Sequence, residues 1–95
     1  MTTEVFLAGK DLAARCADAY SADRYRSWFG VARALLALGL TERQAEAVMR
    51  SKWARWAADG HTARYGSVPT RALVDYVKRN RDEVALLTAE TFGLD

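Results

Sequence analysis

The chain has 95 residues, 51% of them apolar, and a formal net charge of +2, which suits one small helical domain over residues 1–95. Its one cysteine excludes an internal disulfide, and one cysteine with one histidine cannot supply the four ligands of a structural zinc site. No segment approaches the ~20 apolar residues of a membrane span. We therefore expect no metal, no cofactor and no membrane association, and a free thiol fits a cytoplasmic location.

The spacing of apolar residues is helical along nearly the whole chain. Residues 5–7 form a short apolar lead-in, either a strand or only a plug in the core, and a first helix is expected over residues 10–20. Ser21 suits the N-cap of a second helix that runs to about Leu38 and supplies the centre of the core. Gly39 is expected to end that helix, because glycine readily adopts the left-handed conformation that follows a helix C-terminus.

A third helix is expected over residues 41–59. Its start matches a capping box, in which the side chains of Thr41 and Gln44 each accept a hydrogen bond from the other residue's backbone N–H group. Glycine at position 60 is the expected stop signal.

Two further segments decide the architecture. Residues 60–69 contain two glycines and the only proline, so they are expected to form the one longer loop. Residues 70–91 form either one helix or two helices that meet at Asn80. The short connections favour a compact all-α bundle of four or five helices.

Positive charge is concentrated in the middle of the chain. Residues 41–81 carry nine basic and four acidic side chains, a net charge of +5, whereas residues 82–95 carry four acidic side chains and no basic one. This distribution of charge has two interpretations. Either the basic segment binds an anionic partner, or the basic and acidic segments pair with each other within the fold. Lys78, Arg79 and Arg81 lie where a helix closes, so they either complement the helix dipole or extend a phosphate-binding surface.

One face of the third helix is apolar apart from a lysine. Helical spacing places on this face Ala45, Val48, Met49, Lys52 and Trp56. A buried lysine is costly unless it is paired or reaches solvent. Either Lys52 escapes at the edge of the helix, or the second half of the helix leaves the core and exposes Lys52, Trp53 and Trp56.

The opposite face of this helix combines arginine with alanine. Arg43, Ala47 and Arg50 share it, and Gln44 lies beside it. Arginine binds phosphate or guanine, glutamine binds adenine and alanine contacts the thymine methyl group, so the face suits the major groove of DNA. The alternative is an ordinary solvent-exposed face, because the chain uses arginine and alanine throughout, with eleven and eighteen residues respectively.

Residues 34–48, ALLALGLTERQAEAV, resemble the helix-turn-helix of DNA-binding proteins. In that family a glycine occupies the turn, an apolar residue follows it, and two apolar positions of the second helix pack on the first. Leu35 departs from the pattern, because the family has a small residue there. The other places are filled by Gly39, Leu40, Ala45 and Val48.

The leading hypothesis is a small DNA-binding protein, a transcriptional regulator or accessory factor of bacterial or phage type. The resemblance implies that the side chains facing the major groove are Arg43, Gln44, Ala47 and Arg50. It implies backbone phosphate contacts for Arg55, Arg64 and Arg71. A homodimer is expected, because one small module makes few base contacts and a two-fold axis doubles them.

The alternative function is a protein-interaction module of phage or mobile-element type, which binds and modulates a host protein through Lys52, Trp53 and Trp56. An enzyme is not expected. The only histidine, His61, lies in a glycine-flanked loop, and the glycines are too dispersed to form a phosphate-binding loop.

Overall fold

The computed structural model describes residues 2–16, 22–53 and 68–93. The side chains of residues 22–27, 53, 68 and 69 are likewise outside the description. Several predictions therefore fall outside the described residues: the Ser21 cap, most of the loop at 60–69, the end of the third helix, and the positions of Arg55, Trp56, His61 and Arg64.

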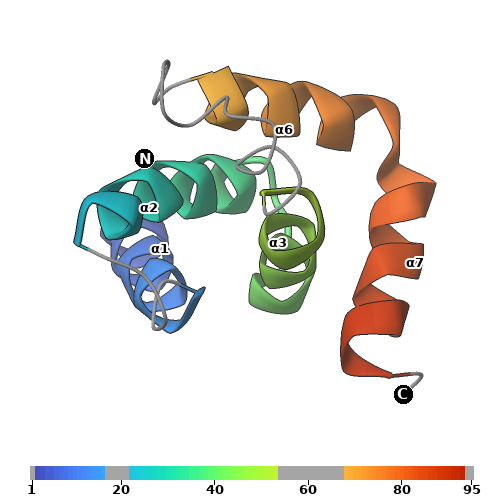
Figure 1. The fold of residues 1–95 in the computed structure, drawn as a ribbon, viewed down its shortest axis with the longest axis horizontal. Helices are drawn as coiled ribbons and strands as arrows, with labels where there is room; N and C mark the ends of the chain where they lie inside the picture. The colour runs from blue at the N-terminus through green and yellow to red at the C-terminus, as the bar shows by residue number, and fades with distance from the viewer. Residues whose placement is uncertain (1, 17–21, 54–67, 94–95) are drawn as a thin grey trace.

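The described residues form five α-helices and one π-helical turn. In chain order they are α1 (Thr3–Cys16), α2 (Ala22–Ala37), α3 (Glu42–Val48), η1 (Met49–Trp53), α6 (Val68–Arg79) and α7 (Arg81–Phe92). Figure 1 shows α1 and α2 as neighbours, α6 at one end of the bundle, and α7 beside α3. The radius of gyration is 12.3 Å, which matches the ~12 Å expected for a compact chain of this length. The predicted all-α bundle is confirmed.

Helix α1 begins earlier than predicted, and the apolar lead-in at residues 5–7 is helical rather than a strand. The hydroxyl group of Thr2 accepts a hydrogen bond from the backbone N–H of Val5 at 3.2 Å, which caps the first turn. Phe6 packs edge-on against Phe29 of α2, with ring centroids 5.3 Å apart. This contact between residues far apart in the sequence stabilises residues 5–7 as the first turns of α1.

Helices α1 and α2 approach each other closely at Gly9. A Cβ atom at this position would lie 3.2 Å from the Cα atom of Arg33 in α2, closer than most real contacts of this kind. Glycine is therefore the residue that permits this helix pair to pack. The core that they share with the other helices is centred on Leu12, Val31, Leu35, Val48, Met49, Leu73 and Val77.

The turn between α2 and α3 follows the prediction. Gly39 adopts a φ of 94°, a conformation that suits glycine, and Leu40 is buried directly after it. The capping box is confirmed, because the Thr41 hydroxyl accepts from the Gln44 backbone N–H at 3.2 Å and the Gln44 side chain accepts from the Thr41 backbone N–H at 3.0 Å. These bonds satisfy two N–H groups that the helix itself leaves unpaired.

The predicted continuous α-helix from residue 41 is wrong after Val48, where the backbone changes to the π-helical turn η1. A π-helical turn holds more residues than an α-helical turn, so it shifts the side chains that follow around the helix axis. The shift affects Lys52, the charged residue that interrupts the apolar face in the sequence.

Residues 68–92 form two helices, which answers the alternative left open at Asn80. The backbone of Asn80 leaves the helical region, with φ −132° and ψ 51°. Its side-chain amide donates to the carbonyl group of Tyr76 at 3.0 Å, and its backbone N–H donates to the same carbonyl at 2.9 Å. Both N–H donors of Asn80 bind the last turn of α6. Because the Asn80 backbone is not helical, the chain changes direction there before α7 begins.

Candidate functional site: the α3 surface and the basic face of α6

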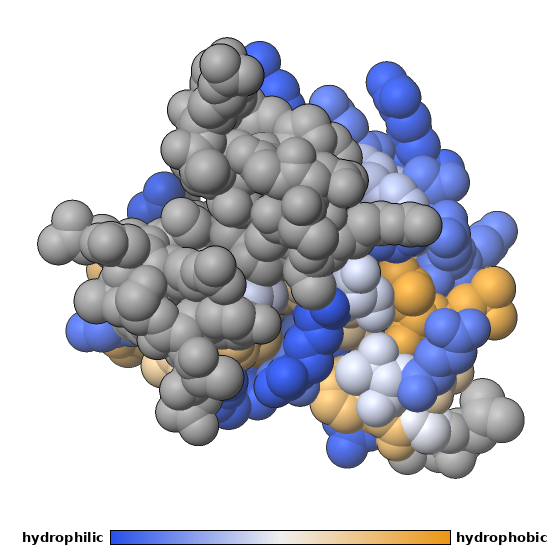
Figure 2. Space-filling view, viewed as in Figure 1, coloured by the Kyte–Doolittle hydropathy of each residue, from blue (hydrophilic) through white to orange (hydrophobic). Residues whose placement is uncertain are grey.

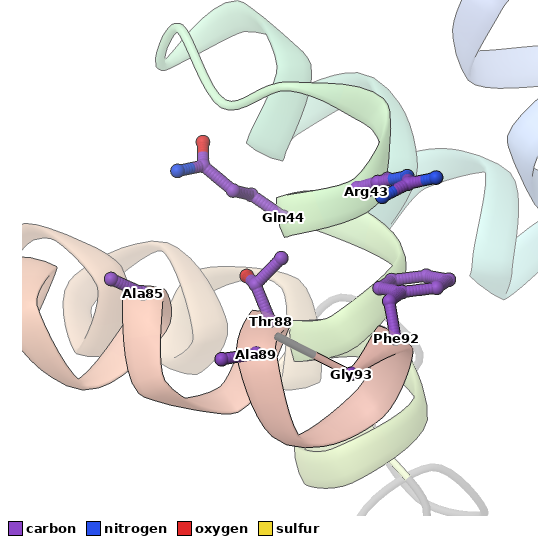
Figure 3. A pocket seen from close by; sticks show the side chains of 7 residues that line it. All are labelled: Arg43, Gln44, Ala85, Thr88, Ala89, Phe92 and Gly93. Carbon is purple, nitrogen blue, oxygen red and sulfur yellow. The ribbon is translucent and has the colours of Figure 1, made fainter. Parts of the chain in front are cut away.

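The first turns of α3 lie against α7, and a shallow pocket of about 320 Å³ separates them. Its lining consists of Arg43, Gln44, Ala85, Thr88, Ala89, Phe92 and Gly93. Figure 3 shows the Arg43 side chain reaching toward Phe92 while Gln44 points away from it, toward the other end of the pocket. The guanidinium carbon of Arg43 lies 5.4 Å from the centre of the Phe92 ring, a distance that gives a cation–π contact.

Ala47 is fully buried, with 0% of its surface exposed. The sequence placed it on a free face opposite the core, and this placement is wrong. The reason is that α7 packs along α3 and covers that side of the helix. Position 47 therefore belongs to the packing between two helices and does not present a methyl group to solvent.

Arg50 is drawn to the other side of α3, toward α1. Its Nε atom lies 3.5 Å from the carboxylate of Glu46, whose side chain is only 9% exposed. Arg15 of α1 holds the same carboxylate at 3.4 Å and also binds Glu42 at 2.9 Å and Asp11 at 3.2 Å. This network joins α1 to α3 and neutralises the buried Glu46 with two arginines.

The residues predicted to read the major groove therefore do not form one open face. Arg43 and Gln44 border the α7 side, Ala47 lies beneath α7, and Arg50 is paired with a carboxylate near α1. Within α3 only Glu42 and Arg43, in the first turn, are exposed, and residues 45–48 are all buried.

Lys52 lies at the edge of the core, as one of the two readings of the sequence expected. Its side chain is 22% exposed, and its ammonium group lies 3.8 Å from the Glu83 carboxylate and 4.9 Å from the centre of the Tyr76 ring. These contacts connect η1 to α6 and α7. Of the other two residues proposed for protein interaction, Trp56 lies outside the described residues, and only the backbone of Trp53 is described.

The Tyr76 hydroxyl is buried at this junction. Burial raises the pKa of Tyr76 to about 12, and the nearby Glu83 carboxylate acts in the same direction. The phenol therefore stays neutral throughout the physiological range, and the charged pair beside it is Lys52 with Glu83.

The outer face of α6 has a different character. Arg71, Lys78 and Arg79 are exposed, and none of them makes an ion pair with a described residue. Arg81, just beyond them, donates to the backbone carbonyl of Leu38 at 3.4 Å. We call Arg71, Lys78 and Arg79 the basic face of α6. Only Arg71 was predicted as a site residue, because helix-end cations have a sufficient structural reason in the dipole.

Comparison with protein families, with curated proteins and with solved structures finds no match to this chain. Among the residues that the structure describes, no group of three or more His, Cys, Asp or Glu side chains is placed to hold a metal ion. No helix in the described part of the chain is both long and apolar enough to cross a bilayer.

Cys16 is buried at the end of α1 and belongs to the core. Burial raises the pKa of its thiol from 9.0 to about 11, and the Glu46 carboxylate adds to this effect, while Arg50 and Arg15 oppose it. A thiol with a raised pKa is a poor nucleophile at neutral pH, which argues against a catalytic role.

The raised pKa of Cys16 predicts a loss of stability in alkali. Ionisation favours the unfolded state, where the pKa is the lower one, so the contribution of this thiol is intact below pH 9 and is lost as the pH rises toward 11. The expected loss is on the order of 2 kcal/mol. Urea unfolding at several alkaline pH values will measure it. The Cys16→Ala variant should lose less stability over this range, and an identical loss in both proteins would contradict the prediction.

Proposed function

We propose that this domain binds double-stranded DNA, as a small regulator or accessory factor of bacterial or phage type. The observation that carries the proposal is the basic face of α6, where Arg71, Lys78 and Arg79 are exposed without carboxylate partners among the described residues. Duplex DNA is a dense array of negative charge, and cations of this kind bind it by displacing condensed counterions.

The pairing of the other cations supports this choice of surface. Arg15 and Arg50 are bound to carboxylates, and Lys52 is bound to Glu83. Of these ion pairs, Lys52 with Glu83 joins the basic middle to the acidic end, whereas Arg50 pairs with Glu46 inside the middle itself. The basic face of α6 takes no part in these ion pairs, so within the described part of the chain its cations are available to an anionic partner.

The test is the salt dependence of binding to a short duplex of mixed sequence, followed by fluorescence anisotropy. If three cations neutralise phosphates, the logarithm of the association constant should fall against the logarithm of salt concentration with a slope of about −3. A wild-type protein that does not bind the duplex even at low salt would overturn the proposal.

A protein-interaction module remains the second candidate, and the outer side of α7 favours it. Leu86 is 64% exposed there, and Ala85 beside it is also exposed. Figure 2 shows apolar atoms gathered over this helix with hydrophilic atoms around them. A contiguous patch of exposed apolar side chains with polar residues around it is typical of a contact surface for another protein. Absence of DNA binding by the wild-type protein would favour this function.

A further inference from the structure

We infer that the domain holds DNA by its sugar–phosphate backbone through the basic face of α6, and that α3 does not enter the major groove. The described part of the domain therefore contacts duplex DNA without reading its sequence. This inference rests on the proposed function and specifies how that function is carried out. It departs from what the helix-turn-helix resemblance implies, because there the second helix is the reading element.

The first argument is steric. The major groove is about 12 Å wide, and a single helix with its side chains is about 10–12 Å across, so a reading helix must stand clear of its neighbours. Helix α3 does not stand clear. Arg15 ties α1 to one side of it through Glu42 and Glu46, and α7 covers Ala47 on the other side. DNA approaching α3 would meet α1 or α7 first.

The second argument concerns the polar groups that would read bases. The Gln44 carbonyl oxygen already accepts from the Thr41 backbone in the capping box. The Arg43 guanidinium lies over Phe92, and Arg50 helps to neutralise the nearly buried Glu46. Transfer of Arg50 to a base would leave that carboxylate with one partner fewer, at the cost of an under-compensated buried charge.

The third argument is the freedom of α6. This helix packs on α2, η1 and α7 through its inner side, and its outer side carries the basic face. Arg71, Lys78 and Arg79 share one face and extend over roughly 12 Å at 1.5 Å per residue. Cations that pair with no described carboxylate suit the phosphate backbone, which requires charge rather than a rigid geometry. The exposed carboxylate of Asp75 lies among them, so the face holds a modest surplus of positive charge.

Two variants that each remove two positive charges test the inference. The Lys78→Ala/Arg79→Ala variant should weaken binding about tenfold or more on every duplex and should lower the salt slope by about 2. The Arg43→Ala/Arg50→Ala variant should bind within about threefold of the wild-type protein, because Arg43 contacts Phe92 and Arg50 pairs with Glu46 in the wild-type fold. Wild-type affinity should also be similar for duplexes of unrelated sequence.

The outcomes separate the inference from the proposed function. Binding that survives Lys78→Ala/Arg79→Ala but is lost in Arg43→Ala/Arg50→Ala, or that depends strongly on sequence, overturns the inference and leaves DNA binding in place. No binding by the wild-type protein overturns DNA binding itself. Circular dichroism and thermal melting confirm that each variant is folded. If the loss of Arg50, a partner of Glu46, unfolds the second variant, Arg43→Ala alone replaces it. The single substitution Arg71→Ala should lower the salt slope by about 1.

Discussion

Substitution of Ala47 by arginine is expected to lower the free energy of unfolding by about 3–5 kcal/mol. Ala47 has no exposed surface and lies between α3 and α7, so an arginine there must either bury an unpaired charge or push α7 away. A loss of this size is a large fraction of the 5–15 kcal/mol that stabilises a typical domain. Urea unfolding followed by tryptophan fluorescence will measure it.

The same substitution distinguishes two structures for this part of the chain. If α3 were a free recognition helix, Ala47→Arg would add an exposed cation, leave stability nearly unchanged and strengthen binding to DNA. Ala14→Arg is the matched control, because Ala14 is an exposed alanine on α1. The control should change stability by less than about 0.5 kcal/mol. Equal stability of the two variants would show that α7 does not cover position 47.

Substitutions at two helical glycines are expected to act in opposite directions. Gly9→Val should lower the free energy of unfolding by about 1–3 kcal/mol, because a Cβ atom would already lie within 3.2–3.3 Å of the Arg33 backbone. The backbone of α2 cannot swing aside as a long side chain could, so the two helices must separate. Chemical denaturation of the variant measures this cost.

Gly30→Ala supplies the comparison. The nearest atom to a Cβ atom at Gly30 is the hydroxyl oxygen of Thr70, at 3.9 Å, which is an ordinary contact. Alanine should therefore fit and should raise stability by about 0.5–1 kcal/mol through its higher helix propensity. A stabilised Gly9→Val variant, or a destabilised Gly30→Ala variant, would show that α1, α2 and α6 pack differently from the structure described.

Local signals in the sequence were reliable where the cause of the structure is itself local. The turn at Gly39 and the capping box of Thr41 with Gln44 depend on residues a few positions apart, and the structure contains both. The end of α6 is also local, because Asn80 bonds the Tyr76 carbonyl one turn earlier. The sequence could name Asn80 as a candidate break, but it could not choose between one helix and two.

The candidate site depends on contacts between distant residues, and the sequence did not specify them. Helical spacing correctly places Ala47 opposite Ala45 and Val48, yet that face is covered by α7, whose position no local pattern encodes. Lys52 is anomalous on an apolar face when only the sequence is considered, but the fold places Glu83 and Tyr76 beside its ammonium group. The sequence predicted a phosphate contact for Arg71 but left two roles open for Lys78 and Arg79. Only the positions of the described carboxylates show that none of them pairs with these three cations.

The corner at Asn80 divides the C-terminal region into two helices with different main packing partners. Helix α6 packs mainly on α2, whereas α7 packs mainly on α3, and the contact between α6 and α7 is smaller than either. Mutations on the outer side of α6 can therefore tune attraction to a charged ligand without disturbing the cover over Ala47. Mutations in α7 can improve or degrade that cover without altering the charge on α6. The charge on the outer side of α6 and the stability of the packing between α3 and α7 can in this way be changed by separate substitutions.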